Sequence, residues 1–163
     1  MLRLLSILFL TYSFHSEKDA RTEATLPLSF KGLSNVVFYQ DDLISGSKPE
    51  GKDGFASLRE LGVKTLICVD GVAPNVALAT EFEINTVHLP WKYNAPSNEQ
   101  ILNVTTVFAR GRTVGNVYIH CHHGKHRSAA ASAVASIALG EMPLEQAIQR
   151  MHISQTSQEY TGL

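Results

Sequence analysis

The 163-residue sequence predicts one α/β domain, with a central, mainly parallel sheet of about four to five strands and helices on both faces. Segments with the composition of strands alternate along the chain with segments of helical spacing, which is typical of a parallel sheet with helical connections. The expected strands are also continuous apolar runs, as strands are when both faces of a sheet are covered. Ligands of such folds bind beyond the carboxyl ends of the parallel strands.

The first half of the chain contains three expected strands: NVVFY at 35–39, LISG at 43–46 and KTLICVD at 64–70. Before the third strand, Phe55, Leu58 and Leu61 recur at helical spacing. Gly62 is placed to end that helix, because glycine adopts the left-handed conformation of a helix C-terminus without steric cost. A short helix is expected over 74–82.

The second half continues the alternation with two further expected strands: NTVHLP at 85–90 and NVYIH at 116–120. Between them, Ser97 and Gln100 have the spacing of a capping box, which predicts the start of a helix that ends at Gly111. The alanine-rich segment RSAAASAVASIAL predicts a helix over 127–139. Pro143 is placed to begin a last helix.

The first 16 residues resemble a short secretory signal sequence, with Arg3 as its positive end and an apolar run over 4–14. The run is too short to span a bilayer, so no stable membrane span is expected. Residues 17–33 are polar and mixed and suggest a linker, which leaves residues 34–163 as the folded domain. These features predict export to the periplasm or the cell exterior; a cytoplasmic location is the alternative.

Composition and charge exclude one class of partner. The net charge of −1 and the pI of about 6.6 provide no basic field for a nucleic-acid backbone, so no nucleic-acid partner is expected. The chain also has only two cysteines, Cys68 and Cys121, which cannot form a disulfide framework.

The segment VYIHCHHGKHRSAA, at 117–130, has the composition of a functional site. A strand is expected to end at His120 and a helix to begin near Arg127, so the chain between them must curl, and Gly124 permits an unusual backbone angle there. A curled loop that leads into a helix directs several backbone N–H groups at one point, where the helix dipole also favours negative charge. Such a loop can bind a tetrahedral dianion.

Two side chains give this loop a reactive chemistry. The planar fork of Arg127 can hold two oxygens of a bound anion. The field that binds the anion also stabilises a thiolate, so Cys121 is expected to ionise below the ordinary thiol pKa of about 8.5. Ser128 is placed to donate a hydrogen bond to that thiolate. A thiolate that faces a bound phosphorus atom is a nucleophile in position for attack.

HCHHGKHRS matches the His-Cys-(five residues)-Arg-Ser/Thr signature of the protein tyrosine and dual-specificity phosphatases. Three wider stretches resemble a bacterial branch of the dual-specificity-like group: ISGSKPEGKDGFASLRELGVKTLICVDG, VHLPWKYNAPS and QTSQEYTGL. The resemblance covers roughly residues 34 to 163 and implies the Cys-x5-Arg phosphatase fold. It implies that Cys121 is the nucleophile that forms a phosphocysteine, that Arg127 binds phosphate, and that His120 and Ser128 tune the thiol. It also implies a set of loop residues that line the phosphate pocket: His122, His123, Gly124, Lys125, His126 and Arg127.

Other interpretations of the same loop fit less well. A zinc site could draw on five side chains: His120, Cys121, His122, His123 and His126. Structural zinc prefers two separated pairs of ligands, and a second pair is missing. A nucleotide-binding Walker loop would require Ser or Thr after the lysine and Gly at the position of Ile119. Sulfur transfer by a rhodanese-like cysteine loop is a further alternative, which the five-residue spacing to Arg and the following Ser disfavour.

The general acid of the expected reaction is missing from its usual position. In the family this acid is an Asp in the loop after the strand that matches TVHLP, whereas here Tyr93 is followed by Asn94. An amide cannot release a proton at neutral pH. Four side chains are candidates for a substitute acid: Asp70, Glu99, His123 and His126. Asp70 alternatively acts only as a turn residue before Gly71.

The sequence therefore predicts a cysteine-dependent phosphatase that hydrolyses phosphate monoesters and needs no metal or organic cofactor. Its substrate would be a phosphorylated protein, small molecule or lipid headgroup. The alternative is a pseudophosphatase that binds a phosphorylated ligand with little turnover, because Asn94 replaces the acid. Cys68 lies near the carboxyl end of its strand, and in the sheet order of this family that strand neighbours the strand of Cys121. The two thiols are therefore candidates for a reversible disulfide. The alternative is that Cys68 is simply a small apolar core residue.

Overall fold

The computed structural model describes residues 20–157 and residue 159. Its sheet has six strands: β1 (Leu28–Phe30), β2 (Leu33–Phe38), β3 (Leu43–Ser47), β4 (Val63–Cys68), β5 (Asn85–His88) and β6 (Asn116–Cys121). The labelled helices are α2 (Gly51–Glu60), α3 (Val76–Glu81), α4 (Asn98–Gly111), α5 (Arg127–Ala138) and α6 (Leu144–Ile153). All the strands and helices expected from the sequence are present.

The sheet has the order β1-β2-β3-β6-β4-β5. The strands β3, β6, β4 and β5 are parallel to their neighbours, and β1 and β2 pair antiparallel at one side. The predicted α/β fold with a mainly parallel sheet is confirmed. The sixth strand exceeds the predicted four to five, because β1 is only three residues long and too short to show a periodic pattern.

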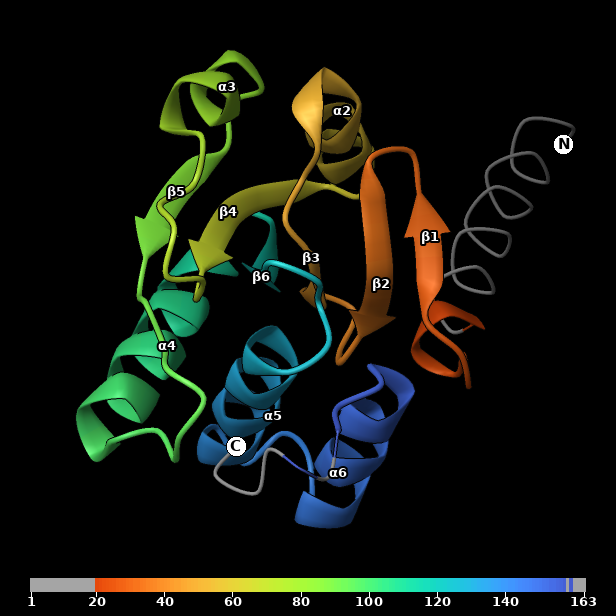
Figure 1. Cartoon of the computed structure of the whole chain (residues 1–163), viewed down its shortest axis with the longest axis vertical. Coiled ribbons are helices and arrows are strands. Elements are labelled where there is room, and N and C mark those ends of the chain that lie inside the picture. The colour runs from red at the N-terminus through yellow and green to blue at the C-terminus, as the bar shows by residue number, and fades with distance from the viewer. Residues whose placement is uncertain (1–19, 158, 160–163) are drawn as a thin grey trace, which may run out of the picture.

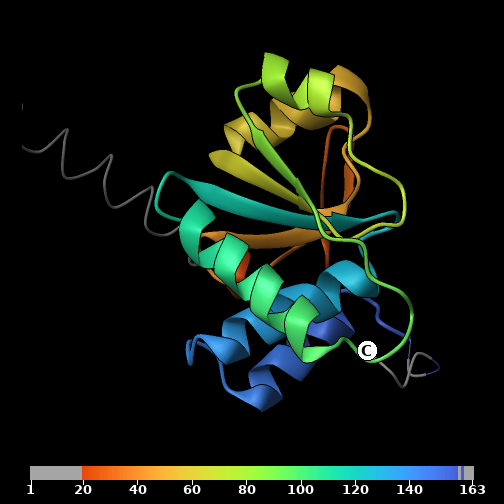
Figure 2. The same cartoon turned by 90° about the vertical axis from the view of Figure 1, so that its left-hand side faces the viewer.

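Helices cover both faces of the sheet, as Figures 1 and 2 show. Figure 2 shows α2 and α3 on one side of the sheet, and α4, α5 and α6 on the other. Each face has its own apolar core. One core is centred on Phe55, Leu58 and Tyr118, and the other on Phe108 and Ile119, all of which are fully or almost fully buried. The central strands are therefore buried on both sides, which explains their continuous apolar sequence.

Local signals explain where helix α4 begins and where helix α2 ends. At the start of α4, Ser97 Oγ accepts a hydrogen bond from the N–H of Gln100 at 3.2 Å, and Gln100 Oε1 accepts one from the N–H of Ser97 at 3.0 Å. The predicted capping box is thus confirmed. After α2, Gly62 has a φ of 72° and its N–H donates to the carbonyl of Arg59, as predicted for a helix C-terminus.

The parallel register brings three strand ends to one edge of the sheet. Ser47 of β3 is aligned with Cys121 of β6, and Cys68 of β4 is aligned with His120. Consequently the segments that follow these strands, including Asp70, lie around the start of the 121–127 loop. This is the edge at which ligands bind in open parallel sheets.

Part of the segment that suggested a linker takes part in the fold. Strand β1 and the start of β2 lie within residues 17–33, and the carbonyl of Ala24 accepts a hydrogen bond from Arg150 Nη1 at 3.1 Å. The sheet therefore begins before Ser34. The signal-like segment 1–16 lies outside the described residues. Within the described part of the chain, no helix is both long and apolar enough to cross a membrane.

Candidate functional site

The 121–127 loop joins the end of β6 to the start of α5, as predicted. Gly124 has a φ of 75°, and a Cβ atom there would overlap the backbone of Gly46 and Ser47. Glycine is therefore required both for the turn and for the close approach of β3. The loop is also tied to its surroundings, because the carbonyl of His122 accepts from the N–H of Lys48 at 3.3 Å and the carbonyl of His123 accepts from Asn35 Nδ2 at 2.8 Å.

The Cys121 thiol lies at the base of this loop and is almost completely buried. Its Sγ is 3.4 Å from Ser128 Oγ. Burial opposes ionisation, but hydrogen bonds from the Ser128 hydroxyl and from backbone N–H groups of the loop and of α5 outweigh it, so the pKa of Cys121 is lowered. The N–H donors belong to Ser128, Gly124 and His126. The structure thus provides the thiolate-stabilising environment that the sequence predicted.

Arg127 is the first residue of α5 and its side chain is largely buried. Its Nη2 is 3.0 Å from Asp70 Oδ1, and its guanidinium carbon lies 4.5 Å from the centre of the Tyr93 ring. Its Nε has no hydrogen-bond partner among the described residues. The guanidinium is therefore oriented by a carboxylate and an aromatic face.

His120 precedes the thiol and is buried within the sheet. Burial lowers the pKa of His120 to about 4, so the ring is neutral at physiological pH. Its Nδ1 is 3.3 Å from the carbonyl oxygen of Cys121. Because a carbonyl oxygen can only accept a hydrogen bond, Nδ1 is the protonated ring nitrogen and donates this hydrogen bond. This hydrogen bond fixes the backbone at the nucleophile.

The chain after α6 supports the loop from the other side. Thr156 Oγ1 donates to the carbonyl of Lys125 at 2.6 Å, and the N–H of Ser157 donates to His126 Nδ1 at 3.2 Å. These two contacts were not predicted from the sequence, since polar residues after a helix give no sign of what they contact. The resemblance of QTSQEYTGL to the terminal segment of the phosphatases was the one available signal.

No protein-family model and no curated protein matches the sequence. Solved structures do match the fold. A P. aeruginosa TpbA variant in complex with pTyr aligns with a TM-score of 0.68 at 17% identity, over 85% of each chain. The active form of Tk-PTP aligns with a TM-score of 0.64 at 17% identity, over 78% of this chain and 91% of that one. PTPMT1 in complex with PI(5)P aligns with a TM-score of 0.58 at 13% identity, over 75% of this chain and 94% of that one.

This chain has the fold of the tyrosine and dual-specificity phosphatases. The fold assignment agrees with the motif, because the Cys-x5-Arg loop of this chain occupies the turn from the central strand β6 to helix α5.

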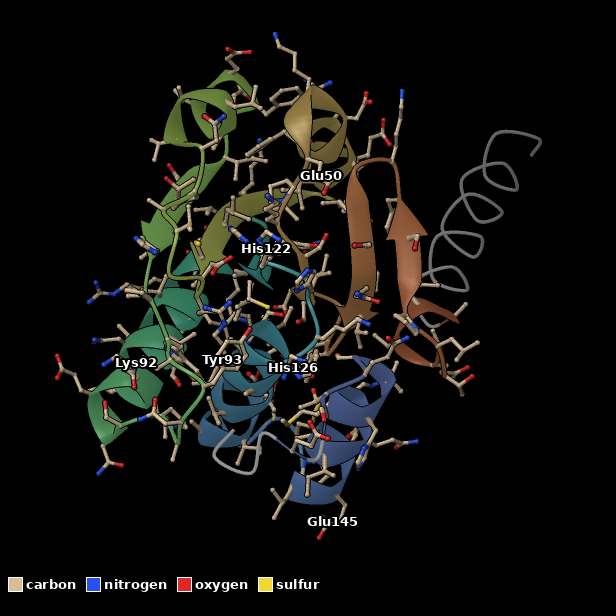
Figure 3. The ribbon with its side chains drawn as sticks, in the orientation of Figure 1. Glu50, Lys92, Tyr93, His122, His126 and Glu145 are labelled. Carbon is tan, nitrogen blue, oxygen red and sulfur yellow. The ribbon has the colours of Figure 1, made fainter. Side chains whose placement is uncertain are left out.

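The rim of the phosphatase-type loop carries several basic groups. The rings of His122 and His123 meet edge to face with their centres 4.4 Å apart. Burial lowers the pKa of His126, and nearby positive charge lowers it further; the sources are Lys125, His123 and Arg127. Figure 3 shows Tyr93 and His126 beside each other below His122, and their ring centres are 6.2 Å apart. The positive charge that lowers the pKa of His126 also favours an anionic ligand at the loop.

The segment that carries the acid in the resembling phosphatases passes the site without a carboxylate. Trp91 is buried and anchors the segment, whereas Tyr93 and Asn94 are exposed. Glu99 lies in the first turn of α4 and is also exposed. Of the carboxylates considered from the sequence, Asp70 is the one that contacts Arg127.

The geometry does not assemble a metal site from the histidines and cysteine of the loop. Among residues 20–157 and 159, no cluster of three or more His, Cys, Asp or Glu side chains could hold a metal ion. The Cys121 thiol instead faces hydrogen-bond donors, which is an arrangement for a nucleophile rather than for a zinc ligand set.

Proposed function

We propose that this chain is a phosphatase that hydrolyses phosphate monoesters through a phosphocysteine intermediate on Cys121. The observation that carries this proposal is the position of the Cys121 thiol. It lies at the base of a loop whose N–H groups, together with the Ser128 hydroxyl, lower its pKa. Arg127, whose guanidinium can bind phosphate, is the first residue of the following helix. Such a site holds a tetrahedral dianion and presents a thiolate to its phosphorus atom.

The chemistry proceeds in two displacements. The Cys121 thiolate attacks phosphorus, the S–P bond forms, and the P–O bond to the leaving group breaks while the leaving oxygen takes up a proton. Water then attacks the phosphocysteine, the S–P bond breaks, and inorganic phosphate leaves. Arg127 and the loop N–H groups stabilise the charge on the equatorial oxygens in both steps. The hydrogen bond from Ser128 stabilises the thiolate as it leaves in the second step.

The basic rim supports a phosphorylated protein or another strongly anionic phosphate ester as the substrate. TpbA was solved with pTyr and PTPMT1 with PI(5)P, so this fold accommodates both an aryl phosphate and a phosphorylated lipid headgroup. His122, His123 and Lys125 would lie beside the leaving group of either substrate. We propose a phosphate monoester on a protein side chain such as tyrosine, or on a lipid headgroup, as the substrate class.

A second candidate function is a pseudophosphatase that retains phosphorylated ligands. The observation that favours it is Asn94, which stands where the resembling phosphatases carry their acid and is exposed. The two functions differ in turnover and share the phosphate site, so binding measurements do not separate them.

The test is hydrolysis of 4-nitrophenyl phosphate by the wild type and by Cys121→Ser. We expect hydrolysis to disappear in Cys121→Ser while binding of a phosphate analogue such as tungstate remains. Cys68→Ser is the matched control, because it removes the other buried thiol, and it should retain activity. Unchanged turnover in Cys121→Ser would overturn the phosphatase assignment. Tungstate binding without any wild-type turnover would favour the pseudophosphatase.

A further inference from the structure

Asp70 joins the phosphate loop to a cavity that the reaction described above does not use. It follows β4, its side chain is buried, and Oδ1 lies 3.0 Å from Arg127 Nη2. The other oxygen, Oδ2, lies 3.7 Å from His122 Nδ1. Oδ1 also accepts a hydrogen bond from the N–H of Gly71 at 2.7 Å, which is the turn role that the sequence suggested. The carboxylate therefore has a structural contact and also faces the site.

The cavity beyond Asp70 has a volume of about 470 Å³. Its apolar walls include Phe55, Val72 and Pro74, and its basic groups are Lys48 and His122. Glu50 also lines the cavity, and in Figure 3 Glu50 and His122 lie above Tyr93 and His126. A space of this size and composition suits an organic leaving group that continues from a phosphate held at Arg127. Asp70 would then lie at the junction of phosphate and leaving group.

We propose that Asp70 is the general acid of this phosphatase in place of Asn94, a role that rests on the proposed phosphatase activity. From Gly71 onward the sequence contains no aspartate, and Asn94 and Glu99 are exposed. His126 Nδ1 accepts a hydrogen bond from Ser157, so that nitrogen is already engaged. Asp70 is a carboxyl group that is both buried and in contact with the phosphate-binding arginine.

The contact with Arg127 places Asp70 beside the phosphate that this arginine would bind. A phosphate dianion that binds Arg127 shares this guanidinium with the Asp70 carboxyl group, so Asp70 and the bound ester lie next to each other. The other titratable or charged groups around Asp70 and its cavity are Cys68 in β4, His88 in β5, His120 in β6, His122 in the loop, and Lys48 and Glu50 before α2.

The proton is conserved through the two steps. As the thiolate forms the S–P bond and the P–O bond breaks, the Asp70 carboxylic acid gives its proton to the leaving oxygen, and an alcohol departs. The resulting carboxylate accepts a proton from the water that attacks phosphorus, while the S–P bond breaks and Cys121 leaves as a thiolate. Ester and water become alcohol and phosphate, and Asp70 is returned to its acid form.

The test compares two leaving groups in Asp70→Asn. Asparagine keeps a carbonyl oxygen toward Arg127 but cannot donate a proton as an acid. Benzyl phosphate needs protonation of its leaving oxygen, whereas 4-nitrophenyl phosphate needs little. We expect kcat/KM to fall about 100-fold or more for benzyl phosphate and less than about 10-fold for 4-nitrophenyl phosphate. Asp70→Glu, which retains a carboxylic acid, should recover part of the loss, and Asn94→Ala should change neither value.

Each outcome has a separate meaning. An equal loss on both substrates would show that Asp70 only positions Arg127, and no loss on benzyl phosphate would show that another group is the acid; either result overturns the proposal. Cys121→Ser is assayed in parallel. Turnover that does not depend on Cys121 would instead refute the phosphatase mechanism itself, and Asp70 with it. Retained tungstate binding by Asp70→Asn establishes that the variant is folded, whatever the affinity. If Asp70→Asn does not fold, Asp70→Glu must retain the wild-type preference between the two substrates.

Discussion

The hydroxyl of Ser128 should determine how much of Cys121 is present as a thiolate at acidic pH. In Ser128→Ala the hydroxyl is lost, while the N–H of residue 128 remains available to the sulfur. A hydrogen bond to a charged group contributes about 1.5–3 kcal/mol. The Sγ–Oγ separation of 3.4 Å is long, which places this bond at the lower end of that range. Since about 1.4 kcal/mol corresponds to a factor of ten, the acid ionisation constant of Cys121 should fall roughly tenfold.

The assay is the rate of alkylation of Cys121 by iodoacetamide as a function of pH, measured on the peptide that contains it. In the wild type the pKa is lowered, so alkylation should persist at pH values at which an ordinary thiol is protonated and unreactive. In Ser128→Ala the whole profile should move to higher pH. Cys68 contributes little, because burial raises its pKa to about 11.

The matched control is Ser132→Ala, one turn further along α5. Ser132 is also fully buried, and its Oγ has no hydrogen-bond partner among the described residues. Its removal should leave the alkylation profile unchanged. An unchanged profile in Ser128→Ala, or an equal change in both variants, would refute the claim that the hydroxyl stabilises the thiolate.

Three further predictions concern His120, Gly124 and the two cysteines. Burial lowers the pKa of His120 to about 4, from an unfolded value of about 6.5. The contribution of neutral His120 to the free energy of unfolding should therefore be fully present above about pH 6.5 and fall by up to about 3 kcal/mol toward pH 4. Urea unfolding of His120→Gln should lose that pH dependence. Gly124→Ala should abolish tungstate binding because of its φ and its overlap with β3, whereas Gly71→Ala, with open space at its Cβ, should not. Mild peroxide should inactivate the enzyme reversibly through a Cys68–Cys121 disulfide, and equally reversible inactivation of Cys68→Ala would contradict this. The aligned positions of Cys68 and His120 on neighbouring strands make the disulfide worth testing.

The sequence predicted the parallel part of the fold well because that part depends on local patterns. The β6 strand is a continuous apolar run, and the residues of the α4 capping box contact each other across three positions, so both are visible in a short window. β1 was missed because three residues carry no periodic signal, and its place depends on pairing with β2.

The candidate site also combines positions that the local sequence predicts with contacts that depend on how distant elements pack. The positions of Cys121, Gly124 and Arg127 follow from a strand, a tight turn and a helix in direct succession. The contact of Arg127 with Asp70 depends instead on the register of β4 against β6, and the contact of Thr156 with Lys125 depends on how α6 packs against α5. Sequence spacing holds no information about either distance.

Cys121 is proposed to carry the phosphoryl group during turnover, and the most direct test of this role is to trap that intermediate. Wild-type protein is mixed with an excess of 4-nitrophenyl phosphate, denatured rapidly and analysed by peptide mass spectrometry. We expect one phosphoryl group on the peptide that contains Cys121, its retention in Cys68→Ser, and its absence from Cys121→Ser. Turnover by wild-type protein with phosphate on a histidine of the loop, or with no covalent phosphate at all, would contradict this role of Cys121.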